Sequence, residues 1–258
     1  MNSYANLAAA AKSVARLLPK SFRKIGLNFL QSVIPPRRMP NSYSQCGEDR
    51  ILSFLYYQLG ISKPRYLDVG TWHPSESNNT YLFYQNGARG VCVEPNPSLI
   101  PLITQVRPED KVLNLGIAEP GAGPCDYFSF SDPQLNTFDA EEANARVQSG
   151  IYKLENQFPV PTMPLSTVLA EHFPQGLDLL SLDAEGLDLT ILKTVDFAVH
   201  RPLSICVETV GYSETLHRAK STEIHELMFA NGYVEYADTY VNTIFVDGRY
   251  FAKQTASH

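Results

Sequence analysis

Short apolar runs alternate along this chain with segments in which apolar residues recur every three or four positions. From about residue 43 onward, each apolar run is stopped by Gly, Pro, Asp or Glu. Such runs predict strands, and the periodic segments between them predict helices. The expected strands are 65–69, 90–94, 111–115, 127–130, 177–182, 203–207, 233–236 and 243–246, and the expected helices are 46–59, 79–86, 98–106, 139–148, 166–172, 187–195 and 222–230.

The order of these elements predicts an α/β fold. Strands that are apolar throughout and are separated by helices indicate a parallel sheet covered on both faces. The connection between 233–236 and 243–246 is too short to hold a crossover helix, so these two strands are expected to run antiparallel. We therefore expect a mostly parallel, seven-stranded, doubly wound sheet with a terminal antiparallel hairpin. Residues 131–158 are polar and, apart from helix 139–148, are expected to be irregular.

The composition is that of a globular protein with one sizeable core, since 44% of the 258 residues are apolar. No run approaches the roughly 18 apolar residues of a membrane-spanning helix, so we expect a cytoplasmic protein. The four Cys lack the spacing of a disulfide framework or a zinc site. Cys92 and Cys206 lie in apolar runs and are expected to be reduced core residues.

Charge is divided unevenly along the chain. The net charge is −6, yet the first 47 residues hold seven Lys or Arg and no Asp or Glu. The remaining residues hold all 27 acids and 14 bases. This division predicts a basic arm, 1–41, and an acidic body, 42–258. An acidic body repels phosphates, which argues against nucleic acid as a partner.

The basic arm also has an amphipathic pattern. Apolar residues repeat at helical spacing in two stretches, with Lys and Arg on the opposite side: Leu7, Ala11, Val14 and Leu18, then Phe22, Ile25, Phe29 and Val33. Basic amphipathic helices of this kind bind anionic membrane surfaces, which would make the protein a peripheral membrane protein. Two alternatives are a helix packed on the body and a targeting peptide.

Carboxylates at the ends of the expected strands are candidate site residues. Four of the first five strands of the predicted parallel sheet end in an acid, at Asp68, Glu94, Asp183 and Glu208, and the third strand ends before Gly116. In an open α/β sheet, ligands bind beyond the carboxyl ends of the strands. A partly buried charge is costly unless it is paired or bound. These acids therefore indicate a binding site at one edge of the sheet.

The first two strand ends suggest a nucleoside cofactor. Gly70 would let the backbone approach a ligand closely, and Glu94 suits the two hydroxyls of a ribose. This pairing serves either NAD or S-adenosylmethionine (SAM). A dinucleotide fingerprint requires further glycines, whereas Gly70 is followed by Thr71 and Trp72. Trp72 would obstruct a pyrophosphate, and SAM has none, so the pattern favours SAM.

The body resembles the FkbM-type methyltransferase family from about residue 43 to residue 246. The segments that carry the resemblance are YSQCGED at 43–49, LDVGTWHP at 67–74, SNNT at 77–80, VEPNP at 93–97, LNLG at 113–116, NTF at 136–138, LSLDAEG at 180–186, RP at 201–202, CVE at 206–208 and NTIFV at 242–246. The resemblance implies a class I, Rossmann-like methyltransferase fold and SAM-dependent methyl transfer, mostly to hydroxyl oxygens of glycans, polyketides and similar metabolites. One departure is Leu187-Asp188, where many relatives carry a longer Glu; we expect it to alter helix packing more than chemistry.

Roles for the site residues follow from the resemblance and the strand ends together. The residues expected to bind the cofactor are Asp68, Gly70, Thr71, Glu94, Pro95, Asn96, Asn114, Gly116 and Asp183. The catalytic base is expected among His73, Asp183 and Glu208, and the acceptor contacts are expected from Asn79 and Glu185. An alternative role for Asp183, Glu185 and Glu208 is to gather a Mg²⁺ that binds a vicinal diol. Segments 43–49 and 131–158 are expected to wall the acceptor pocket.

Two classes of function remain open on the sequence. The first is an O-methyltransferase that acts on a glycan, a glycoconjugate or a related metabolite, with the basic arm holding it near a lipid-linked acceptor. The second is a non-catalytic interaction or trafficking module of the same family. The intact acids at the strand ends favour catalysis.

Overall fold

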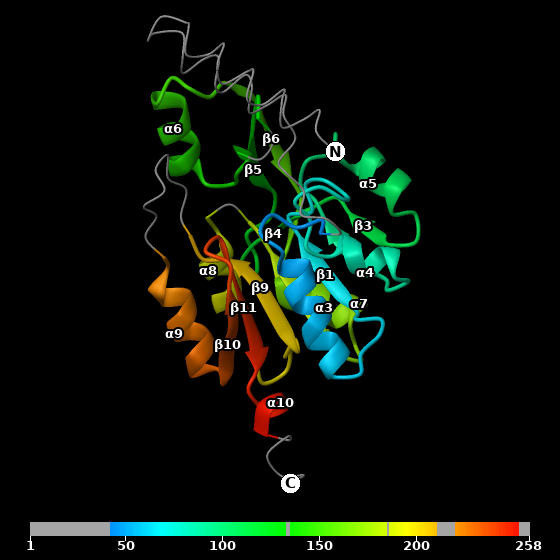
Figure 1. Cartoon of the computed structure of the whole chain (residues 1–258). Helices are drawn as coiled ribbons and strands as arrows, with labels where there is room; N and C mark the ends of the chain where they lie inside the picture. The colour runs from blue at the N-terminus through cyan, green and yellow to red at the C-terminus, as the bar shows by residue number, and fades with distance from the viewer. Residues whose placement is uncertain (1–41, 133–134, 185, 211–219, 253–258) are drawn as a thin grey trace, which may run out of the picture. The chain divides into compact units, whose positions relative to one another are not determined.

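The structure is a computed structural model, and it describes residues 42–132, 135–184, 186–210 and 220–252 (Figure 1). The predicted helices of the arm 1–41 lie outside these residues. The helices are α3 (Glu48–Gln58), α4 (Tyr81–Gln85), α5 (Ile100–Val106), α6 (Ala140–Gln148), α7 (Leu165–His172), α8 (Asp188–Lys193), α9 (Thr222–Ala230) and α10 (Arg249–Ala252). The strands are β1 (Tyr66–Val69), β2 (Gly90–Val93), β3 (Lys111–Leu113), β4 (Gly116–Ile117), β5 (Cys125–Phe130), β6 (Leu154–Val160), β7 (Thr162–Met163), β8 (Leu179–Leu182), β9 (Ser204–Glu208), β10 (Tyr233–Asp238) and β11 (Asn242–Asp247).

Seven strands form the main sheet in the order β10-β11-β9-β8-β1-β2-β3. The five strands from β9 to β3 are parallel, and β11 runs antiparallel to both β9 and β10. The predicted α/β sheet with its terminal antiparallel hairpin is therefore confirmed, and this is the class I methyltransferase fold. The chain runs outward from β1 to β3 and then returns to add β8 on the other side of β1. Ligands bind at such a reversal of strand order.

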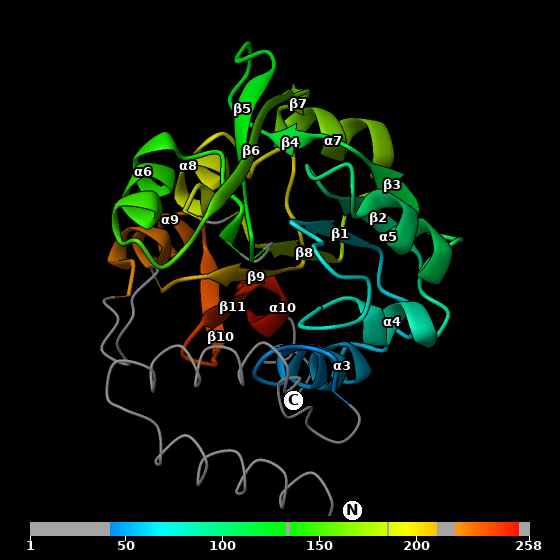
Figure 2. The same cartoon turned by 90° about the horizontal axis from the view of Figure 1, so that it is seen from above.

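Helices cover both faces of this sheet (Figure 2). On one face, Val168 of α7, Ile191 of α8 and Met228 of α9 belong to one buried apolar cluster. On the other, Tyr56 of α3 and Phe83 of α4 belong to a second cluster. Cys92 and Cys206 are buried and free, as predicted. Within the described residues, no helix is long and apolar enough to cross a bilayer.

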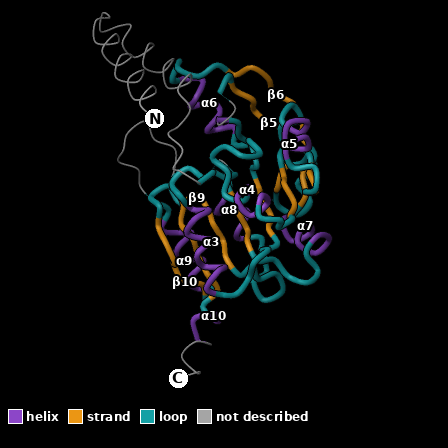
Figure 3. The backbone as a smooth tube through the Cα atoms, turned by 45° about the vertical axis from the view of Figure 1, so that its right-hand side comes forward, coloured by secondary structure: helices purple, strands orange, loops and turns teal. Residues whose placement is uncertain are grey.

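An insert between β4 and β7 stands beyond the carboxyl ends of the main sheet (Figures 1 and 3). It consists of an antiparallel hairpin, β5–β6, and helix α6. The expectation that 131–158 is irregular apart from one helix is wrong for β6. Most residues of β6 are exposed, so its extended form depends on pairing with β5 and not on an apolar face that a pattern could show. The short parallel pair of β4 with β7 was not predicted either.

Candidate active site

The register of the parallel strands brings four strand ends into one row. Val69 lies opposite Val93 on β2 and Leu182 on β8, and Leu182 lies opposite Val207 on β9. The residues that come next in the chain are Gly70, Glu94, Asp183 and Glu208. Neighbouring strands lie about 4.8 Å apart. The carboxylates predicted at separate strand ends therefore share one edge of the sheet.

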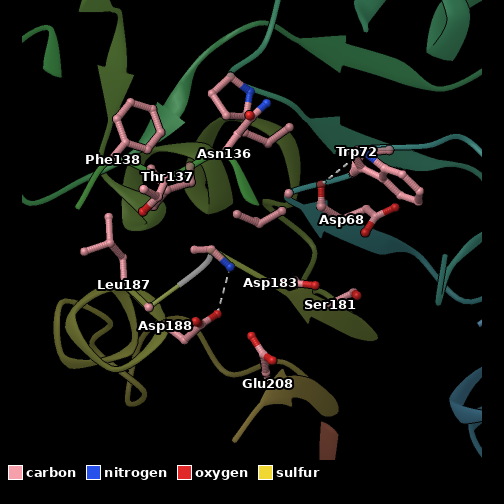
Figure 4. A pocket seen from close by; sticks show the side chains of 18 of the residues that line it. Asp68, Trp72, Asn136, Thr137, Phe138, Ser181, Asp183, Leu187, Asp188 and Glu208 are labelled. Carbon is pink, nitrogen blue, oxygen red and sulfur yellow. Dashed lines mark hydrogen bonds between the residues drawn. The ribbon is translucent and has the colours of Figure 1, made fainter. Parts of the chain in front are cut away.

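A cavity of about 640 Å³ opens at this edge (Figure 4). Its lining includes seven carboxylates: Asp68, Glu94, Glu142, Asp183, Asp188, Glu208 and Glu223. No Lys, Arg or His is found in the lining as far as the described residues form it. Such a cavity favours a cationic or neutral ligand and repels phosphate.

Gly70 makes the turn between the strand ends very tight. Its φ is +76°, and a Cβ at this position would lie 1.9 Å from the carbonyl oxygen of Asp183. The backbone N–H groups of Gly70 and Thr71 both donate to the carbonyl oxygen of Val93, at 3.0 and 3.1 Å. Only glycine fits here, for reasons of both backbone conformation and space.

Glu94 is 3% exposed, and its carboxylate holds the backbone around it. Oε1 accepts a hydrogen bond from the N–H of Asn96 and Oε2 from the N–H of Trp72, each at 2.8 Å. Burial raises the pKa of Glu94 to about 7, although these two bonds oppose the increase. Each carboxylate oxygen has two lone pairs, so both can accept a further bond from a ligand.

Asp68 lines the cavity, and its Oδ2 atom is tied to the core behind it. Oδ2 accepts from Nδ2 of Asn78 at 2.9 Å, from Oγ1 of Thr80 at 2.8 Å and from Nη1 of Arg107 at 3.3 Å. Arg107 is fully buried, and its Nε donates to Asp110 at 2.8 Å. The predicted cofactor residue Asp68 therefore also anchors a buried ionic network.

Asp188 is a buried acid that the sequence did not place in the site. It lines the cavity, and its Oδ1 accepts from the N–H of Ala184 at 3.0 Å. Burial, together with the charge of Asp183, raises the pKa of Asp188 to about 7. The departure from the family pattern at this position therefore bears on the site as well as on helix packing.

The cavity brings together most of the predicted residues. Those that line it are Asp68, Gly70, Thr71, Asn79, Glu94, Pro95, Gly116, Asp183 and Glu208. Nδ2 of Asn79 donates to Oγ of Ser181 at 3.2 Å and lies 3.6 Å from Sγ of Cys206. Both predicted walls contribute, since Gln45 comes from segment 43–49 and 135–138 from the insert.

Three predicted residues do not line the cavity, and Glu185 lies outside the described residues. Nδ1 of His73 accepts from the N–H groups of Ser75 and Glu76, at 3.2 and 2.9 Å, so this ring nitrogen shapes a turn. Asn96 contacts Glu94 through its backbone N–H. Nδ2 of Asn114 donates to the carbonyl oxygens of Glu94 and Pro95, which supports the β2 turn.

Sequence reasoning missed several lining residues, among them Trp72, Asn136, Thr137, Phe138 and Ser181 as well as Asp188. The NTF segment 136–138 carried part of the family resemblance, and this was the available signal. No group of three or more His, Cys, Asp or Glu positioned for a metal occurs in the described residues. The expected set of Asp183, Glu185 and Glu208 cannot be assembled from them because it includes Glu185.

A family model for the methyltransferase FkbM domain matches residues 68–235. This span covers the strand ends, the insert and most of the cavity lining. The chain belongs to the FkbM methyltransferase family. It is thus a SAM-dependent methyltransferase, and the resemblance seen in its motifs is confirmed. No curated protein matches the chain.

Three solved structures are similar to this FkbM-family chain at low identity. A 1,6-didemethyltoxoflavin-N1-methyltransferase of Burkholderia thailandensis with bound S-adenosylhomocysteine (SAH) is 14% identical over 78% of each chain, with a TM-score of 0.40. A TehB-like SAM-dependent methyltransferase of Corynebacterium glutamicum is 11% identical over 93% of this chain and 99% of that one, with a TM-score of 0.39. An O-methyltransferase of Bacillus cereus in complex with SAH is 13% identical over 92% of this chain and 97% of that one, with a TM-score of 0.38. The family assignment rests on the family model alone.

Proposed function

We propose that this chain transfers the methyl group of SAM to a hydroxyl oxygen of a glycan, a glycoconjugate or a related metabolite. The acid-lined cavity at the row of strand ends carries this proposal. A sulfonium is a cation and a sugar hydroxyl is neutral, so the negative lining suits both reactants. The same lining would repel the pyrophosphate of NAD, so the function of a nicotinamide oxidoreductase is less favoured.

Two observations support the fit of SAM to these residues. Gly70 lines the cavity with its backbone alone, so a ligand can approach the main chain closely there. Glu94 has acceptor capacity for two ribose hydroxyls. When bound, SAM supplies a methyl group on a positively charged sulfur.

Asp183 and Glu208 are the residues we propose as base candidates. They follow directly paired residues on adjacent strands, so one can hold the acceptor while the other takes its proton. The carboxylate that acts as base would take the proton of the acceptor hydroxyl, whose oxygen would receive the methyl group that bound SAM supplies. His73 is disfavoured because it does not line the cavity and its Nδ1 serves a turn.

Asn79 is proposed as an acceptor contact because its amide lies at the cavity wall beside Ser181. The basic arm 1–41 is proposed to hold the enzyme at an anionic membrane that carries the acceptor. Together, these two assignments propose that the acceptor carries several hydroxyl groups and is presented at a membrane surface.

Calorimetric titration of SAM and, separately, of NADH into the full chain tests the proposal, each with and without Mg²⁺. We expect SAM to bind with a Kd of roughly micromolar order and NADH not to bind. A dependence on Mg²⁺ would support the metal role of Asp183 and Glu208. Folded protein that does not bind SAM would contradict the proposal and favour the interaction module.

A labelled-methyl assay over a panel of glycans then tests the base. Asp183→Asn and Glu208→Gln remove one candidate each while preserving side-chain shape. We expect the variant that lacks the base to lose methyl transfer. Glu208→Gln should still bind SAH as wild type does, whereas Asp183→Asn also changes a residue expected to bind the cofactor. A variant that retains full transfer excludes the substituted residue as the base.

A further inference from the structure

Asn136 lies between β5 and α6, and its amide group is buried at the cavity wall. The residue is 5% exposed, and its Oδ1 accepts a hydrogen bond from the N–H of Phe130 at 2.8 Å. Its Nδ2 has no hydrogen-bond partner among the residues that the structure describes. A buried donor without a partner is costly. Because Asn136 lines the cavity, this donor is available to the bound molecule.

The backbone around this amide is held in place from two sides. The N–H of Thr137 donates to the carbonyl oxygen of Phe128 at 3.1 Å, and the N–H of Phe128 donates back at 2.9 Å. The ring of Phe138 packs over Gly116, where a Cβ would come within 2.4 Å of the ring. Asn136 is therefore positioned by both the hairpin and the start of β4.

The covalent connectivity of SAM assigns the part of the cavity near Asn136 to the adenine base. The proposed function places the ribose at Glu94, directly after β2, and the sulfur with its amino acid toward Gly70 and Asp183. Adenine is attached on the opposite side of the ribose from the sulfur. It therefore extends past β2 toward Gly116 and the segment 136–138. Figure 4 shows this segment across the pocket from Glu208, the proposed acceptor side.

We propose that Asn136 recognises the adenine of the cofactor, with Nδ2 donating a hydrogen bond to one ring nitrogen and Phe138 flanking the base. Asparagine is suited to adenine, whose ring nitrogens accept hydrogen bonds. This inference rests on the proposed function, because it requires SAM in the cavity. It gives the insert a share in cofactor binding in addition to its predicted role as an acceptor wall.

Binding of SAH to wild type and to Asn136→Asp, measured by calorimetry, tests the assignment. The aspartate keeps an acceptor for the N–H of Phe130 but cannot donate, and SAH lacks the sulfonium charge that an added carboxylate would attract. We expect the variant to bind SAH at least tenfold more weakly. The matched control is Asn144→Asp, the same change at an exposed position of α6, which should bind SAH within twofold of wild type.

Base-modified ligands identify the bond itself. The 1-deaza, 3-deaza and 7-deaza analogues of SAH each replace one ring nitrogen by C–H. We expect one analogue to bind wild type at least tenfold more weakly than SAH does and to show no further loss in Asn136→Asp. If all three analogues bind wild type within twofold of SAH, the inference is wrong.

The outcomes separate the two proposals. If wild type binds SAH and Asn136→Asp binds it with an affinity within twofold of wild type, the role of Asn136 is overturned. The proposed function then stays intact. Wild type that binds neither SAM nor SAH would overturn both. Thermal melting of each variant checks its fold, and Asn136→Ala, which also cannot donate, replaces the aspartate variant in the comparison if the latter is unfolded.

Discussion

The carboxyl group of Glu94 is buried, which makes its negative charge costly in the protein without ligand. Its pKa is raised to about 7 from the ordinary value of 4.5. At a pH between these two pKa values, Glu94 holds a proton in the folded chain that it has released in the unfolded chain. Raising the pH through this window therefore lowers the free energy of unfolding.

We expect Glu94→Gln to remove this pH dependence, because an amide stays neutral throughout. Relative to wild type, the variant should gain about 3 kcal/mol in free energy of unfolding between about pH 5 and about pH 8. Urea unfolding at both pH values measures the difference. Glu119→Gln, at an exposed position, is the control and should show none. Asp188 titrates in the same window in both proteins, so equal pH dependence in wild type and Glu94→Gln would contradict the raised pKa of Glu94.

Gly70 has a second requirement besides its positive φ, namely the space taken by the carbonyl oxygen of Asp183. Gly150 has a similar φ of +67° but nothing within 4 Å of its added Cβ. We expect Gly150→Ala to cost about 1 kcal/mol of backbone strain. Gly70→Ala should cost about 1–3 kcal/mol more, from overpacking, and should weaken SAH binding. Urea unfolding compares the two, and equal losses would mean that the close approach is not tight.

The place of single residues at the strand ends could be predicted from the sequence, because it depends only on where each apolar run ends. Glu94, Asp183 and Glu208 each end an apolar run, and the fold aligns such ends. Asn136 could not be predicted in this way, because its place at the cavity depends on the pairing of Thr137 with Phe128 and on the packing of Phe138 over Gly116. The position of His73 before Pro74 is compatible with a turn residue as well as with a base, and in the structure its Nδ1 serves a turn.

At the scale of elements, Arg107 connects parts of the fold that a pattern cannot connect. It follows α5, donates to Asp68 at the end of β1 and to Thr80 at the start of α4, and pairs with Asp110 before β3. All four side chains are buried. The network therefore fixes the helix–strand connections directly behind the cavity.

We expect Arg107→Met to destabilise the protein by about 3–5 kcal/mol, because it leaves two buried carboxylates without their cation. Arg89→Met is the matched control: it breaks a surface pair with Glu109 and should cost less than about 1 kcal/mol. Urea unfolding at neutral pH measures both. A loss for Arg107→Met as small as that of the control would mean that the two acids are stabilised by other groups.

The inner strands β1, β8 and β9 of the main sheet were predicted well because both of their faces are buried. β8 is apolar except for Ser181, and β9 is apolar between Ser204 and Glu208, so both runs could be recognised in the sequence. β6 lacks this signal, since its sequence LENQFPV is mostly exposed. Its register with β5 is a long-range property of the folded chain.

For the whole molecule, the uneven distribution of charge in the sequence indicates two segments with opposite preferences. The charged side chains among the first 47 residues are all positive, while all the acids lie in the body. Anionic lipid attracts polybasic segments by about 1 kcal/mol for each Lys or Arg near its surface. The arm is therefore expected to supply membrane contact, and the body to supply chemistry.

We expect deletion of residues 1–40 to abolish sedimentation with anionic liposomes and to leave SAM binding unchanged. The control is a full-length protein with Lys20, Arg23 and Lys24 changed to Gln, which should lose much of its liposome binding while keeping the apolar residues. Sedimentation at low and high salt measures the electrostatic share. If the full-length protein does not sediment with anionic liposomes, the membrane role of the arm is contradicted.

The single row formed by Gly70, Glu94, Asp183 and Glu208 has a consequence for how this protein can diverge. Adding or removing one residue within β8 would turn Asp183 to the other face of the sheet and take it out of line with the other three. Among the described strands, β5 and β6 pair only with each other, so the hairpin can change in length without disturbing that alignment. Descendants of this sequence should accordingly differ in their strands by replacement alone. Gains and losses of residues should accumulate in the hairpin, where new acceptors can be accommodated.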